Sequence, residues 1–284
     1  MNNMKVDVVV SAYGKPWQTL CTLKSLMKVS GEHIDKIYLI EEKQQPFGET
    51  NIKMLLNYFD NMIHYVPNEF VEWDKMDNGY HIPEKRYVVR YQYGIEMSDK
   101  KYVFISHNDI LYSKDIIGNM LNQVEDNVGI GLIGQCWNCP AFTSKVCDGN
   151  RFTTYKPSYD EAIKLVSTVR SPRTNTNQID RDNPMPFPEC RLNEFACLIN
   201  REITMEQCKP NGTIPLFATT ILDTADAWFK ALFLKGYKFK NYDINTDCVH
   251  GYYLNGPGQD SQRSNQKYTQ SESFAKKYYE DNFK

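Results

Sequence analysis

The chain has 284 residues, with 33 basic and 35 acidic side chains and a formal net charge of −2 at pH 7. A chain of this length can bury a substantial core, and its balanced charge gives no electrostatic support for a nucleic-acid partner. No apolar stretch is long enough to span a bilayer, and the polar start runs directly into an expected strand, so we expect a cytoplasmic protein.

Strands and helices alternate along the first 110 residues. Apolar and β-branched runs predict strands at 5–12, 34–40 and 62–66 and within 101–110, and helical spacing of apolar side chains predicts helices at 17–29, 52–59 and 86–97. This alternation is typical of an α/β fold with a mostly parallel sheet and right-handed crossovers. We therefore expect residues 1–110 to form a nucleotide-binding half.

The pattern changes after residue 110. It predicts helices at 113–123, 159–169, 227–235 and 271–283 and strands at 129–135, 194–201 and 238–244. Residues 138–189 contain six prolines and form an irregular insertion, either a lid or acceptor-binding segment or a loop without a role. We predict a single domain over 1–284, whose second half, 111–284, carries the insertion 138–189 and a C-terminal helix at 271–283.

Three of the eight cysteines lie close together, at Cys136, Cys139 and Cys147. The two-residue gap between the first pair matches half of a zinc site, but no second pair at that spacing follows. The sequence therefore favours reduced, buried thiols or an incidental turn over structural zinc.

The expected strand within 101–110 ends in His107, Asn108 and Asp109. Ligands of open α/β sheets bind just beyond the carboxyl ends of the strands, and a carboxylate there is a natural ligand for Mg²⁺ or Mn²⁺. The alternative is a polar turn in which Asp109 or Ser113 caps the next helix. Further on, Asp223 and Asp226 have the spacing of a helix cap and its partner.

Taken in order, the strand ends resemble the GT-A fold of family-2 glycosyltransferases. Residues 8–13 resemble the family's first strand and its nucleotide-contacting turn. Residues 37–42 resemble its second strand, which ends in an acidic pair that holds the base and the ribose. Residues 90–95 are similar to an arginine-containing helix start. Residues 107–109 stand in the place of the Asp-x-Asp signature and are close to the Asn-Asn-Asp version of rhamnosyl- and galactofuranosyltransferase-like members.

The resemblance also implies roles for individual residues. Asp109 and His250 would bind the metal, and the general base would be Asp223 or Asp226, with Asp223 favoured because the entrance of its helix faces the site. The residues expected to bind the nucleotide lie at the ends of the early strands and before the metal ligand: Ser11, Ala12, Tyr13, Glu41, Glu42, Arg90, His107 and Asn108.

The activity implied by the resemblance is that of an inverting, Mg²⁺- or Mn²⁺-dependent glycosyltransferase of surface polysaccharide biosynthesis. Its donor would be a UDP-, dTDP- or GDP-linked sugar, and its acceptor a hydroxyl of a glycan or a lipid-linked glycoconjugate. Peripheral association with the inner face of the membrane and a homodimer stay open.

Two alternatives remain. One is a nucleotidyltransferase, whose Gly-rich loop is poorly matched by Gly14-Lys15. The other is a catalytically degenerate nucleotide-sugar-binding protein, suggested by the loss of the first Asp of the metal motif.

Overall fold

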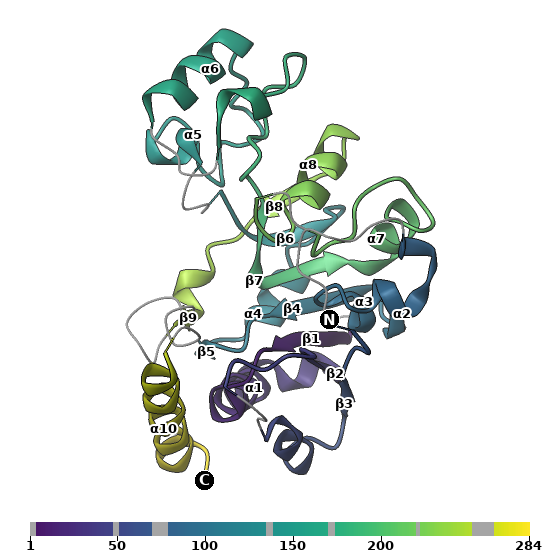
Figure 1. Cartoon of the computed structure of the whole chain (residues 1–284), viewed down its shortest axis with the longest axis vertical. Helices are drawn as coiled ribbons and strands as arrows, with labels where there is room; N and C mark the ends of the chain where they lie inside the picture. The colour runs from purple at the N-terminus through teal and green to yellow at the C-terminus, as the bar shows by residue number, and fades with distance from the viewer. Residues whose placement is uncertain are drawn as a thin grey trace.

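The computed structural model describes residues 4–47, 51–69, 79–134, 139–169, 174–219, 222–251 and 264–284. A seven-stranded sheet with the order β3-β2-β1-β4-β7-β6-β8 forms its centre (Figure 1). The strands of this sheet are β1 (Val6–Ala12), β2 (Ile34–Glu41), β3 (Met62–Tyr65), β4 (Tyr102–Ser106), β6 (Gly129–Ile133), β7 (Leu192–Asn200) and β8 (Phe239–Asn241). A second sheet pairs β5 (Ile110–Tyr112) with β9 (Cys248–His250).

All strands of the central sheet are parallel to one another except β7, which is antiparallel to β4 and β6 on its two sides. The mostly parallel α/β architecture predicted from the sequence is therefore confirmed. Because β7 runs in the opposite direction, its amino end lies at the same edge as the carboxyl ends of β1, β2 and β4. This edge collects the polar residues that the sequence analysis singled out.

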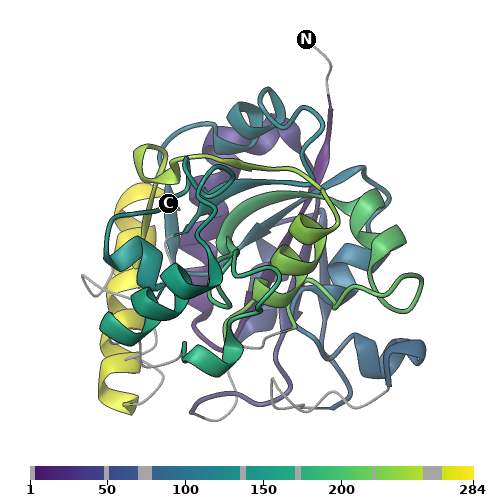
Figure 2. The ribbon, with the colours of Figure 1, turned by 90° about the horizontal axis from the view of Figure 1, so that it is seen from above.

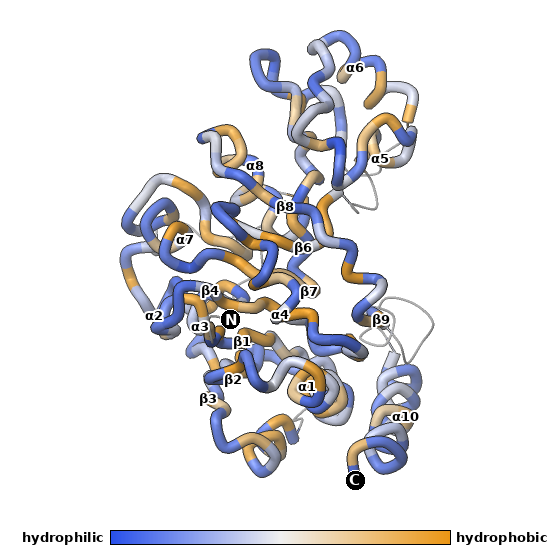
Figure 3. The backbone as a smooth tube through the Cα atoms, turned by 180° about the vertical axis from the view of Figure 1, so that it is seen from behind, coloured by the Kyte–Doolittle hydropathy of each residue, from blue (hydrophilic) through white to orange (hydrophobic). Residues whose placement is uncertain are grey.

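Helices cover both faces of the sheet. Along β1, Val9 belongs to the core cluster that includes α3 (Gln92–Met97) and α8 (Asp226–Leu234). Val8 and Val10 belong to the cluster on the other face, which includes α1 (Pro16–Ser30) and α4 (Ile116–Leu121). This alternation follows from the period of two of a strand that is buried on both faces. In Figure 3 the hydrophobic segments gather in the strands, for example in β4 and β7. The remaining described helices are α2 (Pro83–Arg86), α5 (Pro140–Thr143), α6 (Tyr159–Thr168), α7 (Arg201–Gln207) and α10 (Asn265–Asn282).

The helix predicted at 86–97 is wrong, because the chain forms two short helices, α2 and α3, in its place. Tyr91, between them, has a φ of 68°, which no continuous right-handed helix allows. The side chain of Arg86 bridges the break, because its guanidinium forms an ion pair with Glu96 and donates a hydrogen bond to it at 2.7 Å. The segment predicted as a helix at 52–59 is a 3₁₀-helix over Ile52–Asn57.

The insertion and the C-terminal helix lie at opposite ends of the molecule (Figure 1). The chain between β6 and β7 carries α5 and α6, which project beyond the sheet. Helix α10 packs alongside α1 (Figure 2). It begins at Asn265, six residues before the predicted range. Within the described ranges, no helix combines the length and apolar character needed to cross a membrane.

Candidate functional site

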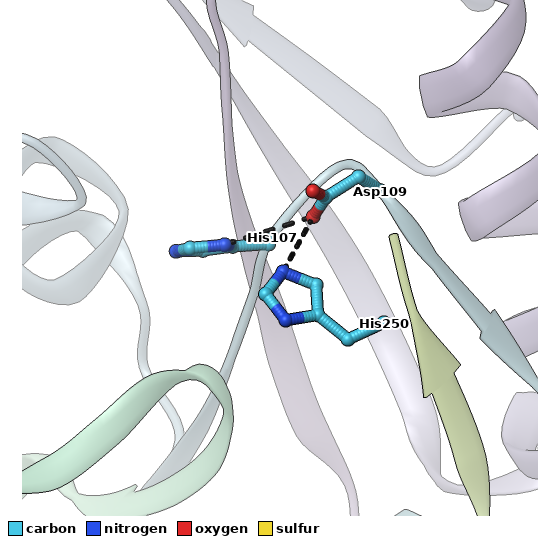
Figure 4. Close-up of side chains that lie close together, drawn as sticks. All are labelled: His107, Asp109 and His250. Atoms are coloured by element: carbon cyan, nitrogen blue, oxygen red, sulfur yellow. Dashed lines mark ion pairs between the residues drawn. The ribbon is translucent and has the colours of Figure 1, made fainter. Parts of the chain in front are cut away.

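Three side chains converge where β4 leaves the sheet (Figure 4). His107 follows β4 directly, and Asp109 lies between β4 and β5. Strand β9 pairs with β5 so that His250 is opposite Ile110, and the N–H of Gly251 donates a hydrogen bond of 2.8 Å to the carbonyl of Asp109. This small sheet brings His250 beside a carboxylate that lies 141 positions earlier in the chain.

The geometry of these three residues suits a cation. Asp109 Oδ1 lies 3.2 Å from His250 Nε2 and 3.6 Å from His107 Nδ1, and one ligand atom from each residue lies within 4.8 Å of the other two. Two donors that bind one cation at about 2.1 Å and at right angles are about 3 Å apart. Asp109 is only 6% exposed, and its Oδ1 accepts no hydrogen bond from the described residues. A buried carboxylate oxygen without a hydrogen-bond donor, beside two imidazoles, is what a metal ligand requires.

The electrostatics of the cluster are dominated by two buried carboxylates. Burial favours the neutral form of His107, but its contacts with Asp109 and Glu194 outweigh burial and raise the pKa of His107 to about 9. Burial raises the pKa of Asp109, yet the two histidines outweigh it and hold that pKa well below its usual range. The two carboxylates therefore require a positive partner, which can be an imidazolium or a metal cation.

His250 is further fixed by an aromatic contact. Its ring stacks on Phe195, with the centroids 4.5 Å apart and the planes inclined by 8°. Because Phe195 lies on β7 and its carbonyl accepts a hydrogen bond of 2.9 Å from the N–H of His107, the same strand orients both imidazoles.

Glu194 and Arg191 connect this cluster to one of the predicted bases. His107 Nε2 lies 3.2 Å from Glu194 Oε1, and Arg191 forms an ion pair with the other oxygen of Glu194. Arg191 also donates a hydrogen bond of 2.8 Å to the carbonyl of Thr224 and lies 3.2 Å from Asp223 Oδ2. Arg191 is 5% exposed, whereas the Asp223 side chain is 27% exposed. Asp223 is therefore held by a buried cation at the edge of the site.

Asp226 has a different environment. It is 1% exposed, and its carboxylate accepts hydrogen bonds from the N–H groups of Leu222 at 2.7 Å, Asp223 at 2.9 Å and Ala227 at 2.5 Å. These bonds fix the turn that leads into α8. The prediction that Asp223 is the N-cap is wrong, because Ala225, with a φ of 69°, occupies that position and has no side-chain cap.

The predicted nucleotide-binding residues lie at the same edge of the sheet. Ser11 and Ala12 end β1, Tyr13 follows them, and Ala12 is directly opposite Glu41 at the end of β2. Glu42 forms an ion pair with Arg90, with 3.1 Å between Oε1 and the guanidinium nitrogen.

Two charge interactions link the predicted nucleotide-binding residues to neighbouring side chains. The charge of Arg90 also interacts with that of Glu194, which joins the group to the histidine cluster. On the other side, Glu41 Oε2 lies 2.8 Å from Nε2 of His64, a histidine on the neighbouring strand β3.

Asn108 fastens the end of β4 to helix α1. Its side-chain Nδ2 donates a hydrogen bond of 3.1 Å to Thr19 Oγ1, and its backbone carbonyl accepts one of 3.0 Å from Gln18 Nε2. The hydroxyl of Thr22 accepts a further bond of 3.1 Å from the N–H of Ile110. The first turns of α1 therefore shape the loop that carries Asp109. The alternative, in which Asp109 or Ser113 caps the next helix, is wrong, because Asp115 caps α4 through the N–H of Gly118.

Several site residues were missed by the sequence analysis. Charged side chains are rarely buried unless they are paired, so Glu194 and Arg191, at the start of a buried strand, could have been identified from the sequence as members of a site. Their importance depends on the antiparallel direction of β7, which no local pattern encodes. His64, which pairs with Glu41, gave no comparable signal.

The cysteine cluster is only partly within the described residues. Cys139 and Cys147 are buried free thiols, and burial raises the pKa of both. Cys136 lies outside the described residues.

No protein-family model matches the chain, and no curated protein matches it in sequence. Solved glycosyltransferases resemble it in structure. The glycosyltransferase GlyE of Streptococcus pneumoniae TIGR4 matches over 98% of this chain and 63% of its own, with 11% identity and a TM-score of 0.42. The chain thus spans less than two thirds of that enzyme. Mouse xyloside xylosyltransferase 1 matches over 84% of this chain and 85% of its own, with 12% identity and a TM-score of 0.45. The galactosyltransferase LgtC, solved with donor and acceptor sugar analogues, matches over 84% of this chain and 74% of its own, with 13% identity and a TM-score of 0.41.

Proposed function

We propose that this chain is a divalent-metal-dependent glycosyltransferase that moves a sugar from a nucleoside-diphosphate donor to a hydroxyl of a glycan or glycoconjugate. The observation that carries the proposal is the cluster of His107, Asp109 and His250 at the carboxyl ends of the parallel strands. Metal ligands at this edge of an α/β sheet lie where a nucleotide binds. Departure of a nucleoside diphosphate is a reaction that needs a cation at that point.

His107, Asp109 and His250 would hold the cation, which, when bound, supplies a Lewis acid that neutralises charge on the departing diphosphate. Two imidazoles beside one carboxylate favour Mn²⁺ over Mg²⁺, because Mg²⁺ prefers oxygen ligands. We propose that Glu41 and Glu42 face the ribose and base of the donor. His64 and Arg90, which pair with these two carboxylates, orient them.

Asp223 is the base that the geometry favours, because its carboxylate is partly exposed whereas that of Asp226 is buried and accepts three backbone hydrogen bonds. In this proposal Asp223 takes the proton of the acceptor hydroxyl while Arg191 holds its other oxygen. A single displacement with one base gives inversion at the anomeric carbon. We assign acceptor binding to the insertion between β6 and β7.

A donor panel tests the proposal. The protein is incubated with UDP-, dTDP- and GDP-linked sugars and simple glycoside acceptors, with Mn²⁺, with Mg²⁺ or with EDTA, and released nucleoside diphosphate is measured. We expect release with one class of donor, faster with Mn²⁺ than with Mg²⁺, and none with EDTA. Asp109→Asn should abolish release, while Asp99→Asn, a change at a mostly exposed carboxylate, should leave it unchanged.

Other outcomes of this panel would contradict the proposal. Pyrophosphate release from a nucleoside triphosphate and a sugar phosphate would indicate a nucleotidyltransferase. Nucleotide binding without turnover of any donor would indicate a binding protein. Product with a retained anomeric configuration, read from its proton NMR coupling constant, would exclude the single displacement assigned to Asp223.

A further inference from the structure

The C-terminal helix contacts the turn between β1 and α1 through two side chains. Tyr268 and Glu272 are one turn apart on α10 and therefore share a face. The hydroxyl of Tyr268 accepts a hydrogen bond of 2.8 Å from the N–H of Lys15. The carboxylate of Glu272 accepts hydrogen bonds from the N–H of Trp17 at 2.9 Å and of Gln18 at 3.2 Å. Glu272 thus caps a helix that begins more than 250 residues before it.

Lys15, at the centre of this contact, is a buried cation. It is 3% exposed, and it occupies the N-cap position of α1 without capping the helix through its own side chain. Its φ of 59° follows a φ of 69° at Gly14, so two successive residues have left-handed backbone. Only glycine adopts this conformation readily, and a strained non-glycine residue beside a candidate site is a reason to look for a function.

The charge of Lys15 interacts with the carboxylates of both Asp109 and Glu272. Burial lowers the pKa of Lys15, and these two carboxylates oppose that effect. The first turn of α1 also contacts the loop that carries Asp109, because Gln18 and Thr19 form hydrogen bonds with Asn108. Glu272 is therefore connected to the candidate metal site in two ways. One is the charge of Lys15, and the other is the first turn of α1, which binds both Glu272 and Asn108.

We propose that Lys15 binds the diphosphate of the donor and that Glu272 of α10 is the residue that positions it. This inference rests on the proposed function. A lysine ammonium is a compact cation that commonly binds phosphate. A diphosphate bound at Asp109 adds negative charge beside a buried carboxylate, and Lys15 supplies a positive charge from within the protein. The C-terminal helix would then be part of the donor site.

A double-mutant cycle tests this inference. The probe is the one of UDP, dTDP and GDP that binds the wild-type protein with Mn²⁺, and its Kd is measured by titration calorimetry. Lys15→Met should weaken binding about tenfold or more, because a hydrogen bond to a charged group is lost. Glu272→Gln should weaken it about three- to tenfold, with Glu272→Asp in between. In the Lys15→Met background, Glu272→Gln should have no further effect, because it acts through Lys15.

Matched controls separate this role from general destabilisation. Lys28→Met and Glu280→Gln change exposed residues of the same two helices and should leave the Kd unchanged. Lys15→Arg keeps the charge and should retain most of the affinity.

Two results would overturn the inference: wild-type affinity in Lys15→Met, or additive effects in the double variant. If Lys15→Met does not fold, wild-type affinity in both Glu272 variants overturns it. Failure of all three nucleotides to bind the wild-type protein would instead remove the proposed function, and this inference with it.

Discussion

At the scale of single residues, two aspartates three positions apart have opposite environments. Asp223 is partly exposed, with Arg191 beside Oδ2 and the N–H of Thr224 bonded to Oδ1, whereas the buried Asp226 accepts three backbone hydrogen bonds. A general base needs an accessible oxygen, and a buried carboxylate that accepts three N–H groups stabilises a turn.

Asparagine substitutions should separate these two roles. Asp223→Asn should lower kcat about 10²- to 10⁴-fold, the usual contribution of a general base, with little change in Tm. Asp226→Asn turns an amide N–H₂ towards backbone donors and should cost about 1–3 kcal/mol of unfolding free energy. Steady-state kinetics and urea unfolding of both variants measure the two effects. Full activity in Asp223→Asn would show that the base is another group.

The sequence predicted Asp109 and His250 as metal ligands, because the end of a strand and the order of motifs along the chain can both be read from it. It could not predict how the ring of His107 is oriented beside them, because that depends on the direction of β7 and on the carboxylate of Glu194. Residue type also failed to distinguish Asp223 from Asp226, since only the fold decides which one is buried.

At the scale of elements, helix α3 packs against the sheet through a glycine. A Cβ added to Gly94 would lie 2.6 Å from Val9 Cγ1 and 2.9 Å from Tyr38 Cβ. The short helix therefore lies close to β1 and β2, directly after Arg90. Its position sets where the guanidinium of Arg90 meets Glu42.

Gly94→Ala should lower the free energy of unfolding by about 1–3 kcal/mol, because overpacking outweighs the better helix propensity of alanine. Gly31→Ala is the matched control, since its Cβ would meet only Met27 Cε at an ordinary 3.5 Å. Its effect should stay within about 0.5 kcal/mol. Urea unfolding of the two variants checks this comparison, and equal stabilities would contradict the close packing.

Most elements were predictable because buried strands and amphipathic helices have distinct periods. The failures have physical causes. The expected helix at 86–97 breaks at a left-handed Tyr91 that the sequence does not mark. Strand β9 has three residues, too few for a periodic pattern, although it positions His250.

At the scale of the whole molecule, the last helix of the chain packs on its first helix, beside the candidate site. Helix α10 packs along α1, and Cys21 Sγ donates a hydrogen bond of 3.2 Å to the carbonyl of Ala275. The ring of Trp17 lies 5.7 Å from that of Tyr279 and 5.4 Å from the ammonium of Lys276. The sequence predicted a C-terminal helix at 271–283, but the surface on which it packs could not be read from a polar segment.

This packing partly buries the carboxylate of Glu272, and the stability of the protein should depend on pH as a result. Burial raises the pKa of Glu272 to about 7, although the N–H groups of Trp17 and Gln18 and the charge of Lys15 oppose it. Its other ionisable neighbour is Tyr268, on the same helix. Because the folded state binds this proton more tightly than the unfolded state, its contribution is complete below about pH 4.5 and is lost as the pH rises through about 7.

Glu272→Gln has no proton to lose, so its stability relative to that of the wild type should rise as the pH increases from 5 to 8. Its amide N–H₂ faces one of two backbone donors, the N–H of Trp17 or of Gln18, so its stability at pH 5 should lie below that of the wild type. The rise follows from about 1.4 kcal/mol per unit of pKa shift, so we expect at most about 3 kcal/mol. Urea unfolding at pH 5, 6, 7 and 8 measures it, with Glu280→Gln as the exposed control on the same helix. Identical pH dependence of Glu272→Gln and the wild type would contradict the prediction. A variant that is more stable at pH 8 yet binds nucleotide more weakly would show that this carboxylate is kept for the donor site and not for the fold, because a purely structural residue would change both properties in the same direction.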